Sequence, residues 1–286
     1  MKIGALAWLV DRCQGVAAWA ARLDRDVAVA KAHGADLVMT AEYAPMEFAA
    51  GDVPDLAGEL ARAVAWTDAA IAAAQVIAAR HQIWLLPGTL PCRMGDAIHN
   101  RAPLIAPDGG IGWQDKHVMT RFEAESWGIS AGAPPAVFET PWGRIGIAIC
   151  FDLEFPHLVR AQVEAGAWLI LAPSCTDTVQ GFNRVRIAAA ARAMENQCFV
   201  ALAPTVGAAP WCGTLDDNHG QAGIFGPVDR GFPEDGVLAL GGMDAPGWVF
   251  AEIDAASLAA VRRDGAVRNH RSWPPAPPPC PVVALV

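Results

Sequence analysis

The chain has 286 residues, of which 53% are hydrophobic and 18% charged, and its formal net charge is −9. This length and composition suit one large, well-packed domain and differ from those of disordered chains. Lysine and arginine are scattered along the chain rather than clustered, which argues against nucleic acid, or an anionic membrane surface, as the main partner.

The seven cysteines include no closely spaced C-x-x-C pair, which favours a reducing, cytoplasmic setting over a disulfide scaffold or a zinc ribbon. The apolar run 3–10 stops at Asp11 and Arg12, so we expect a buried strand there rather than a signal peptide. We find no segment with the roughly 20 apolar residues of a membrane helix. The sequence therefore predicts a protein without a membrane partner.

The first third of the chain alternates strand-like and helix-like segments. Strands are expected at residues 3–9, 36–40 and 83–86, and helices at 16–32 and 55–81. This alternation predicts parallel pairing at the centre of a sheet and an α/β fold.

Two hairpins are expected next. The turn 107–110 joins apolar strands 102–106 and 111–114, and the turn 141–143 joins strands 137–139 and 144–149. We then expect helices at 157–166 and 183–196, and strands at 168–172, 199–203, 222–225 and 248–253. No linker interrupts this series, so residues 1–273 are predicted to form a single domain and residues 274–286 a proline-rich, extended C-terminal tail.

Cys150 is the first candidate for chemistry. It closes an apolar strand and precedes a segment that turns into a helix. Open α/β sheets place their sites at the carboxyl ends of strands. Backbone N–H groups at such a turn lower the pKa of a thiol and stabilise an oxyanion. On local context alone, a buried structural cysteine is an equally good interpretation.

A nucleophilic thiol needs a proton acceptor, and the two best-placed of the seven histidines, His117 and His157, have no obvious orienting carboxylate. Glu42 directly follows an apolar strand, and Lys116 ends a hairpin strand. Taken singly, each of these two residues suits a solvated strand end as well as a cleft.

Together these segments resemble the nitrilase (carbon–nitrogen hydrolase) superfamily, in its amidase-like branch. The resemblance rests on 38–43 with Glu42, 114–128 with Lys116 and Glu123, 146–156 with Cys150, and the helical stretch 191–196. It extends from residue 1 to about residue 273. It implies a four-layer α-β-β-α sandwich with two mixed β-sheets and an active site at one end of the sheets.

The resemblance also implies roles for these residues. Glu42 would be the general base, Cys150 would form a thioester acyl-enzyme, and Lys116 would stabilise the oxyanion together with the backbone N–H of Phe151. Glu123 would position the substrate and the lysine. We expect Tyr43 and Ser174 to border the pocket, and we expect neither a metal nor an organic cofactor.

Phe151 departs from nitrile-cleaving members, which typically carry tryptophan after the nucleophile. We therefore favour a small amide or carbamoyl substrate, with a nitrilase as the alternative. Acyl transfer to an amine and a catalytically silent, ligand-binding member are further alternatives. Glu154 and His157 depart from the amidase-like pattern and leave the identity of the substrate open. The family resemblance also implies a homodimer or a larger homo-oligomer.

Overall fold

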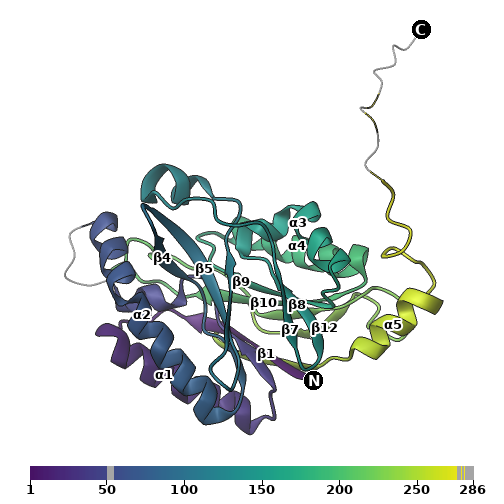
Figure 1. Cartoon of the computed structure of the whole chain (residues 1–286), viewed down its shortest axis with the longest axis horizontal. Coiled ribbons are helices and arrows are strands. Elements are labelled where there is room, and N and C mark those ends of the chain that lie inside the picture. The colour runs from purple at the N-terminus through teal and green to yellow at the C-terminus, as the bar shows by residue number, and fades with distance from the viewer. Residues whose placement is uncertain (50–54, 276–277, 279, 281–286) are drawn as a thin grey trace.

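The structure, a computed structural model, describes residues 1–49, 55–275, 278 and 280 (Figure 1). Its strands form two halves of one curled sheet. The first half contains β1 (Lys2–Leu9), β2 (Leu37–Met39), β3 (Trp84–Leu86), β4 (Leu90–Met94), β5 (Ala97–Ile105), β6 (Ile111–Asp115) and β13 (Gly247–Glu252). The strands β1, β2 and β3 pair in parallel at the centre, and the other four strands add antiparallel pairs.

The second half is built in the same way. It contains β7 (Val137–Thr140), β8 (Gly143–Ile147), β9 (Leu169–Ser174), β10 (Phe199–Val206), β11 (Gly223–Phe225) and β12 (Val237–Leu240). The strands β8, β9 and β10 are parallel, and β7, β11 and β12 are antiparallel to their neighbours. The two halves join through two residue pairs, Trp8 with Thr205 and Leu9 with Val206, so each half is free to pack its inner face against the other.

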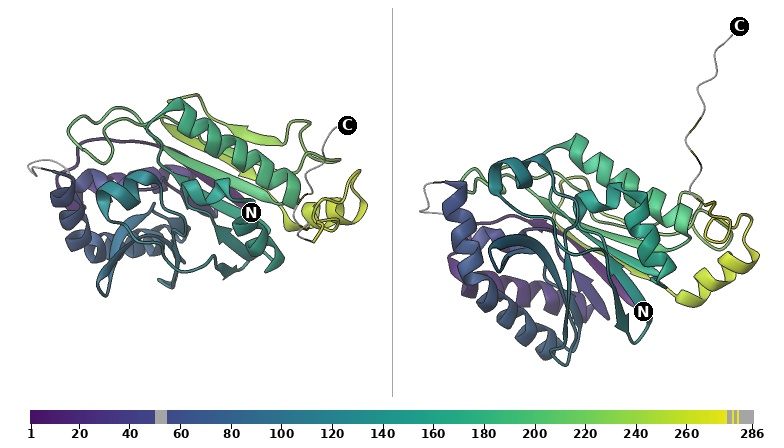
Figure 2. Two further views of the ribbon diagram at one scale, coloured as in Figure 1. Left: turned by 90° about the horizontal axis from the view of Figure 1, so that it is seen from above. Right: turned by 45° about the horizontal axis from the view of Figure 1, so that its top comes forward.

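Helices cover the two outer faces of this arrangement (Figure 2). On the first half lie α1 (Gly15–Ala32) and α2 (Leu56–His81), and on the second half lie α3 (Pro156–Glu164) and α4 (Val179–Asn196). The remaining helices are α5 (Ala255–Asp264) near the C-terminus and the short η1 (Ala44–Phe48), η2 (Phe122–Trp127) and η3 (Cys150–Glu154).

The alternation of side chains along each strand produces the layers. In β1, Ile3 and Ala5 enter the core that the two sheet halves share, whereas Leu6 and Trp8 enter the core beneath α1 and α2. Both faces of the strand are therefore apolar. The predicted four-layer α-β-β-α sandwich with mixed sheets is confirmed.

The predicted elements occur within a few residues of their expected bounds, with informative exceptions. Helix α4 begins at Val179, four residues before its expected start, because the Thr178 side chain caps it by accepting a hydrogen bond from the Gly181 N–H at 3.1 Å. Strands β4 and β12 and helix α5 were not predicted. Residues 122–127, for which no helix was predicted, form the π-helix η2.

Helix α2 corrects one expectation. Among the described residues, it is the one helix long and apolar enough to cross a membrane by length and composition. A core helix meets the same criterion, and α2 buries one face, which includes Ala63, Ala70, Ala74 and Ile77, against α1 and the first sheet half.

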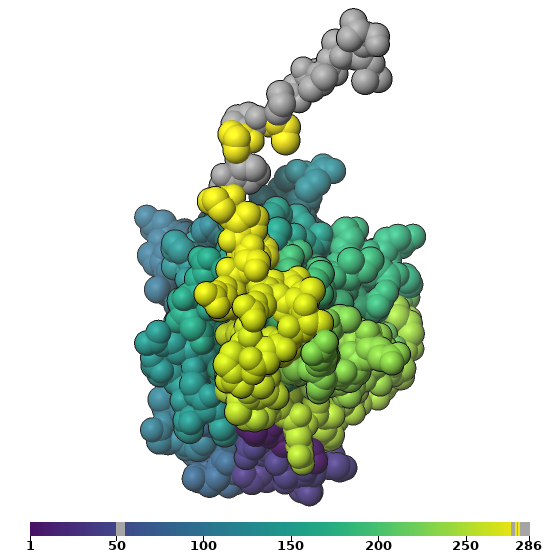
Figure 3. Space-filling model, turned by 90° about the vertical axis from the view of Figure 1, so that its right-hand side faces the viewer, coloured from purple at the N-terminus to yellow at the C-terminus, as the bar shows by residue number. Residues whose placement is uncertain are grey.

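The C-terminal region gathers on one face of the molecule (Figure 3). There the Arg160 guanidinium lies 4.7 Å from the ring centre of Trp273, and it donates to the carbonyl oxygen of His270 at 3.2 Å. Most of the predicted extended tail, residues 274–286, lies outside the described residues. The division between a domain of residues 1–273 and this tail stays a prediction.

Candidate active site

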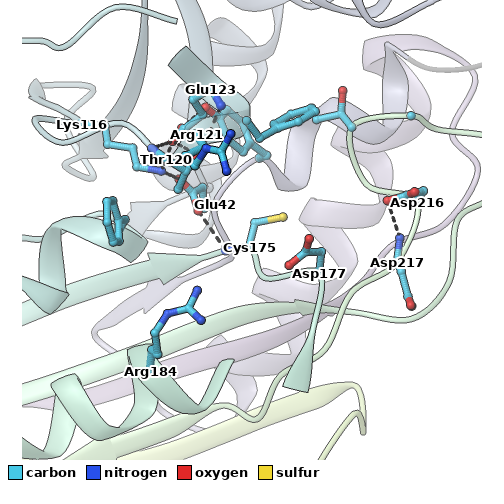
Figure 4. Close-up of a pocket in the computed structure, with 15 residues that line it drawn as sticks. Glu42, Lys116, Thr120, Arg121, Glu123, Cys175, Asp177, Arg184, Asp216 and Asp217 are labelled. Carbon is cyan, nitrogen blue, oxygen red and sulfur yellow. Dashed lines mark hydrogen bonds and ion pairs between the residues drawn. The ribbon is translucent and has the colours of Figure 1, made fainter. Parts of the chain in front are cut away.

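The ends of strands bring the candidate residues together. Glu42 follows β2, Lys116 follows β6, and Cys150 follows β8 and begins η3. Glu123 joins them from η2. The four side chains, far apart in the sequence, are at most 4% exposed. Figure 4 shows Glu42, Lys116 and Glu123 clustered at one side of a pocket.

Lys116 bridges the two carboxylates. Its Nζ lies 2.8 Å from Oε1 of Glu42 and 2.7 Å from Oε2 of Glu123. One buried ammonium thus faces two buried carboxylates, and the cluster of three ionised groups has a net charge of −1. Burying such a charge is costly unless further hydrogen bonds satisfy the oxygens.

Further donors do satisfy the oxygens of both carboxylates, and Glu123 has more of them than Glu42. Glu123 accepts from the Tyr43 hydroxyl at 2.7 Å, from the Thr120 N–H at 2.9 Å and from the Thr120 hydroxyl at 2.8 Å. Glu42 accepts from the Cys175 N–H at 3.0 Å. The Asn100 side-chain amide donates to both carboxylates, at 2.9 Å to Glu42 and 3.3 Å to Glu123.

This difference separates the two glutamates electrostatically. Burial raises the pKa of Glu42 and nearby Glu123 raises it further, so that Lys116 compensates only in part. Burial also raises the pKa of Glu123, but Lys116 and the donors from Tyr43 and Thr120 outweigh it, and the net shift is downward. Burial lowers the pKa of Lys116, but the two carboxylates hold it well above its ordinary value. Glu123 is therefore a fixed anion, and Glu42 is the carboxylate suited to carry a proton.

Cys150 adopts a left-handed backbone conformation, with φ of 46°, which residues other than glycine seldom adopt. Its thiol donates to the carbonyl oxygen of Cys175 at 3.6 Å and also interacts electrostatically with the Glu42 carboxylate. Burial and then the Glu42 carboxylate raise the pKa of the thiol well above its ordinary value. The resting thiol is therefore protonated and has a carboxylate acceptor beside it.

Buried contacts outside the pocket fix the loops that carry these residues. The buried Asp152 carboxylate accepts the backbone N–H of His117 at 3.0 Å and that of Val118 at 2.7 Å, and so ties the turn after Cys150 to the segment after Lys116. Near Glu42, Gly88 adopts a φ of 99°, and a Cβ there would lie 2.4 Å from the Ala41 carbonyl oxygen. Glycine permits both the backbone conformation and the close approach.

The site opens into a pocket of about 450 Å³, a volume typical of small-molecule sites. Its mouth carries both signs of charge. The Arg121 guanidinium pairs with Glu125 at 2.9 Å, and that of Arg184 pairs with Glu154 at 3.4 Å. The lining residues include Glu42, Tyr43, Lys116, Thr120, Arg121, Phe122, Glu123, Phe151, Cys175, Asp177, Arg184, Gly213, Thr214, Asp216 and Asp217.

The structure brings six of the seven candidate residues to the pocket or directly against its lining. Tyr43 and Phe151 line it, and the Cys150 thiol donates to the carbonyl oxygen of Cys175, which is a lining residue. Ser174 differs from expectation: it is 1% exposed, donates to the Ala172 carbonyl oxygen at 3.4 Å, and is not a lining residue. The lining position belongs to its neighbour Cys175.

Sequence reasoning missed Asn100, Thr120 and the contact made by Asp152. Asn100 lies within β5, a strand that was expected to start only at residue 102. The polar run His99–Arg101 does not look like a buried strand in the sequence. No sequence pattern shows that the side chain of Asn100 is buried against a glutamate. Thr120 precedes Glu123 by three residues, a spacing typical of side-chain capping, and this signal was available.

Comparisons with known proteins identify the family of this chain. The family model for carbon–nitrogen hydrolases matches residues 4–263. The chain is 37% identical over 193 residues to a probable hydrolase, YhcX, of Bacillus subtilis, a match that covers 68% of this chain and 38% of that longer protein. It is 30% identical over 211 residues to the deaminated glutathione amidase of Synechocystis, covering 69% of this chain and 74% of that enzyme.

Solved structures show the same fold. The crystal structure of Saccharomyces cerevisiae Nit3, a member of the nitrilase superfamily, aligns with a TM-score of 0.74 at 20% identity, covering 96% of this chain and 97% of Nit3. An amidase from Nesterenkonia sp. aligns with a TM-score of 0.73 at 26% identity, covering 96% of this chain and 99% of the amidase. The chain thus belongs to the carbon–nitrogen hydrolase family, within the nitrilase superfamily, and the predicted amidohydrolase class is confirmed.

Proposed function

We propose that this enzyme hydrolyses a small amide or carbamoyl compound through a thioester on Cys150, with Glu42 as general base and Lys116 as oxyanion stabiliser. The observation that carries the proposal is that Glu42 interacts with the Cys150 thiol and also pairs with Lys116, which in turn pairs with Glu123. The amidase relatives from Synechocystis and Nesterenkonia support an amide substrate.

In the first half-reaction, Cys150 Sγ attacks the carbonyl carbon of the substrate while Glu42 takes the thiol proton. Negative charge develops on the carbonyl oxygen, and the Lys116 ammonium and the Phe151 N–H stabilise it. The tetrahedral intermediate then expels ammonia or an amine, which leaves with the proton that Glu42 returns. The product of this step is a thioester between the acyl group and Cys150.

In the second half-reaction, Glu42 takes a proton from water as the water oxygen attacks the thioester carbonyl. The carbon–sulfur bond breaks, the acid leaves, and the proton returns to the Cys150 sulfur. Glu123 remains an anion throughout, because its donors lower its pKa, and it keeps Lys116 charged and in place.

The decisive experiment measures ammonia release across matched short amides, ω-amides, carbamoyl amino acids and nitriles. The Cys150→Ala variant serves as the blank, and acid and amide products from nitriles are separated by chromatography. We expect turnover of an amide or carbamoyl compound that disappears in the variant. Turnover confined to nitriles would replace this proposal by a nitrilase, and turnover that survives in Cys150→Ala would exclude the proposed nucleophile.

We also propose a cytoplasmic homodimer or larger homo-oligomer. The seven cysteines are all free, in keeping with a reducing compartment. Helix α4 carries the exposed apolar side chains Val179, Ile187 and Met194, of which Ile187 is 60% exposed. A monomeric mass in light scattering at micromolar concentration would contradict the oligomer, and fractionation of cells tests the compartment.

A further inference from the structure

Asn100 occupies the centre of the buried cluster, yet it is not one of the expected reacting residues. Its residue exposure is 0%, and it contacts the cluster in three ways. The side-chain Nδ2 donates to Oε1 of Glu42 at 2.9 Å and to Oε1 of Glu123 at 3.3 Å. Its backbone carbonyl oxygen accepts the Lys116 N–H at 2.8 Å. One residue of β5 therefore contacts both carboxylates through its side chain and the backbone of Lys116 through its own backbone.

The hydrogen bonds divide unequally between the two oxygens of Glu42. Oε1 accepts from Lys116 Nζ and from Asn100 Nδ2, which fill the two lone-pair directions of a carboxylate oxygen. Oε2 accepts from the Cys175 N–H at 3.0 Å and keeps one direction for a further proton. If the amide of Asn100 were reversed, its oxygen would face two carboxylate oxygens, so electrostatics sets its orientation.

The other end of the amide supports a dedicated role. Within the described part of the chain, the buried Oδ1 of Asn100 has no hydrogen-bond partner. A buried polar atom without a partner is costly and uncommon. The amide is thus retained for its two donated hydrogen bonds, although its acceptor is left unsatisfied.

We propose that Asn100 is a positioning residue that pins Oε1 of Glu42 and thereby assigns Oε2 as the atom that exchanges protons with Cys150, the leaving group and water. The inference rests on the proposed role of Glu42 as general base. Asn100 touches no reacting atom itself. Its effect on the reaction passes through the orientation of the Glu42 carboxylate.

The charged and titratable groups around Asn100 make the test specific. Glu42 faces it from the segment after β2, Glu123 from η2 and Lys116 from the end of β6, with Tyr43 and Cys150 in contact with these glutamates. An aspartate at position 100 would be a third carboxyl group beside one ammonium. Protonated, it donates to Oε1 as the amide does; ionised, it repels both glutamates.

The experiment compares Asn100→Leu and Asn100→Asp with the wild-type enzyme on the best amide from the panel, over the full pH range of stability. We expect Asn100→Leu to lower kcat about 100-fold with little change in KM, because a misoriented base costs on this scale. We expect Asn100→Asp to be active only in a narrow pH range just above the acid limb set by Glu42, and to lose activity as rising pH ionises the new carboxyl group.

Asn196→Leu is the matched control, because Asn196 is another asparagine at 0% exposure, and it donates to the Arg192 carbonyl oxygen at 3.1 Å, outside the pocket. It should lose stability but keep its kcat per folded molecule and its pH profile. An Asn100→Leu variant that behaves like this control, or an Asn100→Asp variant with the wild-type pH profile, overturns the inference alone. An inactive wild-type enzyme overturns the proposed function and this inference with it.

Discussion

Two buried glutamates, five residues apart, each lie beside a cysteine and a cation, yet only one of them belongs to the pocket. Glu42 contacts Cys150 and Lys116. Glu47, in η1, accepts from the Cys13 thiol at 3.1 Å, and Nη1 of Arg22 donates to both of its carboxylate oxygens, at 3.0 and 3.2 Å. Burial is the main cause that raises the pKa of each glutamate.

The two clusters differ in what remains available for chemistry. Oε2 of Glu47 also accepts from the Trp8 indole at 3.0 Å and from the Asp11 N–H at 3.1 Å, so donors surround the carboxylate. Arg22 forms an ion pair with Glu47, and its guanidinium lies 4.3 Å from the Trp8 ring centre. Lys116, in contrast, forms ion pairs with two carboxylates, and both of these line a cavity. A glutamate with a raised pKa beside a thiol is therefore not enough to define an active site. The carboxylate must also keep a lone pair that is free to accept a proton and faces a pocket.

Replacing each of the two cysteines by alanine should give the largest difference in activity between the two clusters. We expect Cys150→Ala to lower kcat/KM by at least about 10⁴-fold, as removal of a nucleophile does, with a fold that circular dichroism cannot distinguish from wild type. Cys13→Ala should keep activity within about twofold, because its thiol contacts only the structural cluster. Loss of activity in folded Cys13→Ala would break the comparison.

The same substitution at the two glutamates should separate activity from stability. Glu42→Gln should lower kcat by about 10²–10⁴-fold, the usual contribution of a general base. Glu47→Gln places an NH₂ group against the donors of Trp8, Asp11 and Arg22, and we expect it to lower the free energy of unfolding by about 1–3 kcal/mol. Urea unfolding and initial rates on the same samples measure both, and a Glu47→Gln enzyme with impaired kcat but normal stability would contradict the assignment.

Replacing Lys116 by arginine and Arg22 by lysine tests whether each cluster needs the geometry of its own cation. Lys116→Arg introduces a planar guanidinium where the side chain is 1% exposed and bridges two carboxylates, and we expect about a 100-fold loss of kcat/KM from the displaced groups. Arg22→Lys loses the stacking on Trp8 and the hydrogen bond from the second guanidinium nitrogen to the Leu9 carbonyl oxygen, and we expect it to cost about 1 kcal/mol of stability with activity unchanged. Equal activity of the two variants would show that Lys116 is not needed as a compact cation.

The pH dependence should be the mildest effect. Because burial raises the pKa of Glu42, the protonated, inactive base persists to higher pH than an ordinary glutamate permits. The acid limb of kcat/KM should therefore lie above about pH 4.5, with activity falling about tenfold per unit as pH drops below it. The pKa of Lys116 is raised, so it should add no basic limb near neutrality. The apparent value belongs to the coupled Glu42–Glu123 pair, and an acid limb at the ordinary glutamate value would argue against Glu42 as the base.

Much of the fold follows from local pattern. The apolar runs ending near Glu42, Lys116 and Cys150 predicted the strands that carry them, and the order of these residues predicted the family. Where local chemistry was ambiguous, the elements were missed: Pro91 and Arg93 mask β4, and charged residues 121–125 resemble a loop although they enter the π-helix η2. A hydrogen-bonding pattern such as that of a π-helix has no clear sequence period of its own.

The sequence by itself determined which residue types stand at the ends of strands, since hydrophobic periodicity and chain order are local properties. The tertiary structure alone decided which buried glutamate faces the pocket and which is enclosed by donors, because that depends on groups brought in from elsewhere. Asn100 meets Glu42 across 58 residues, and Cys175 meets it across 133. Asn100 reaches Glu42 from another strand of the same sheet half, and Cys175 reaches it from the other half, so no local pattern records either contact.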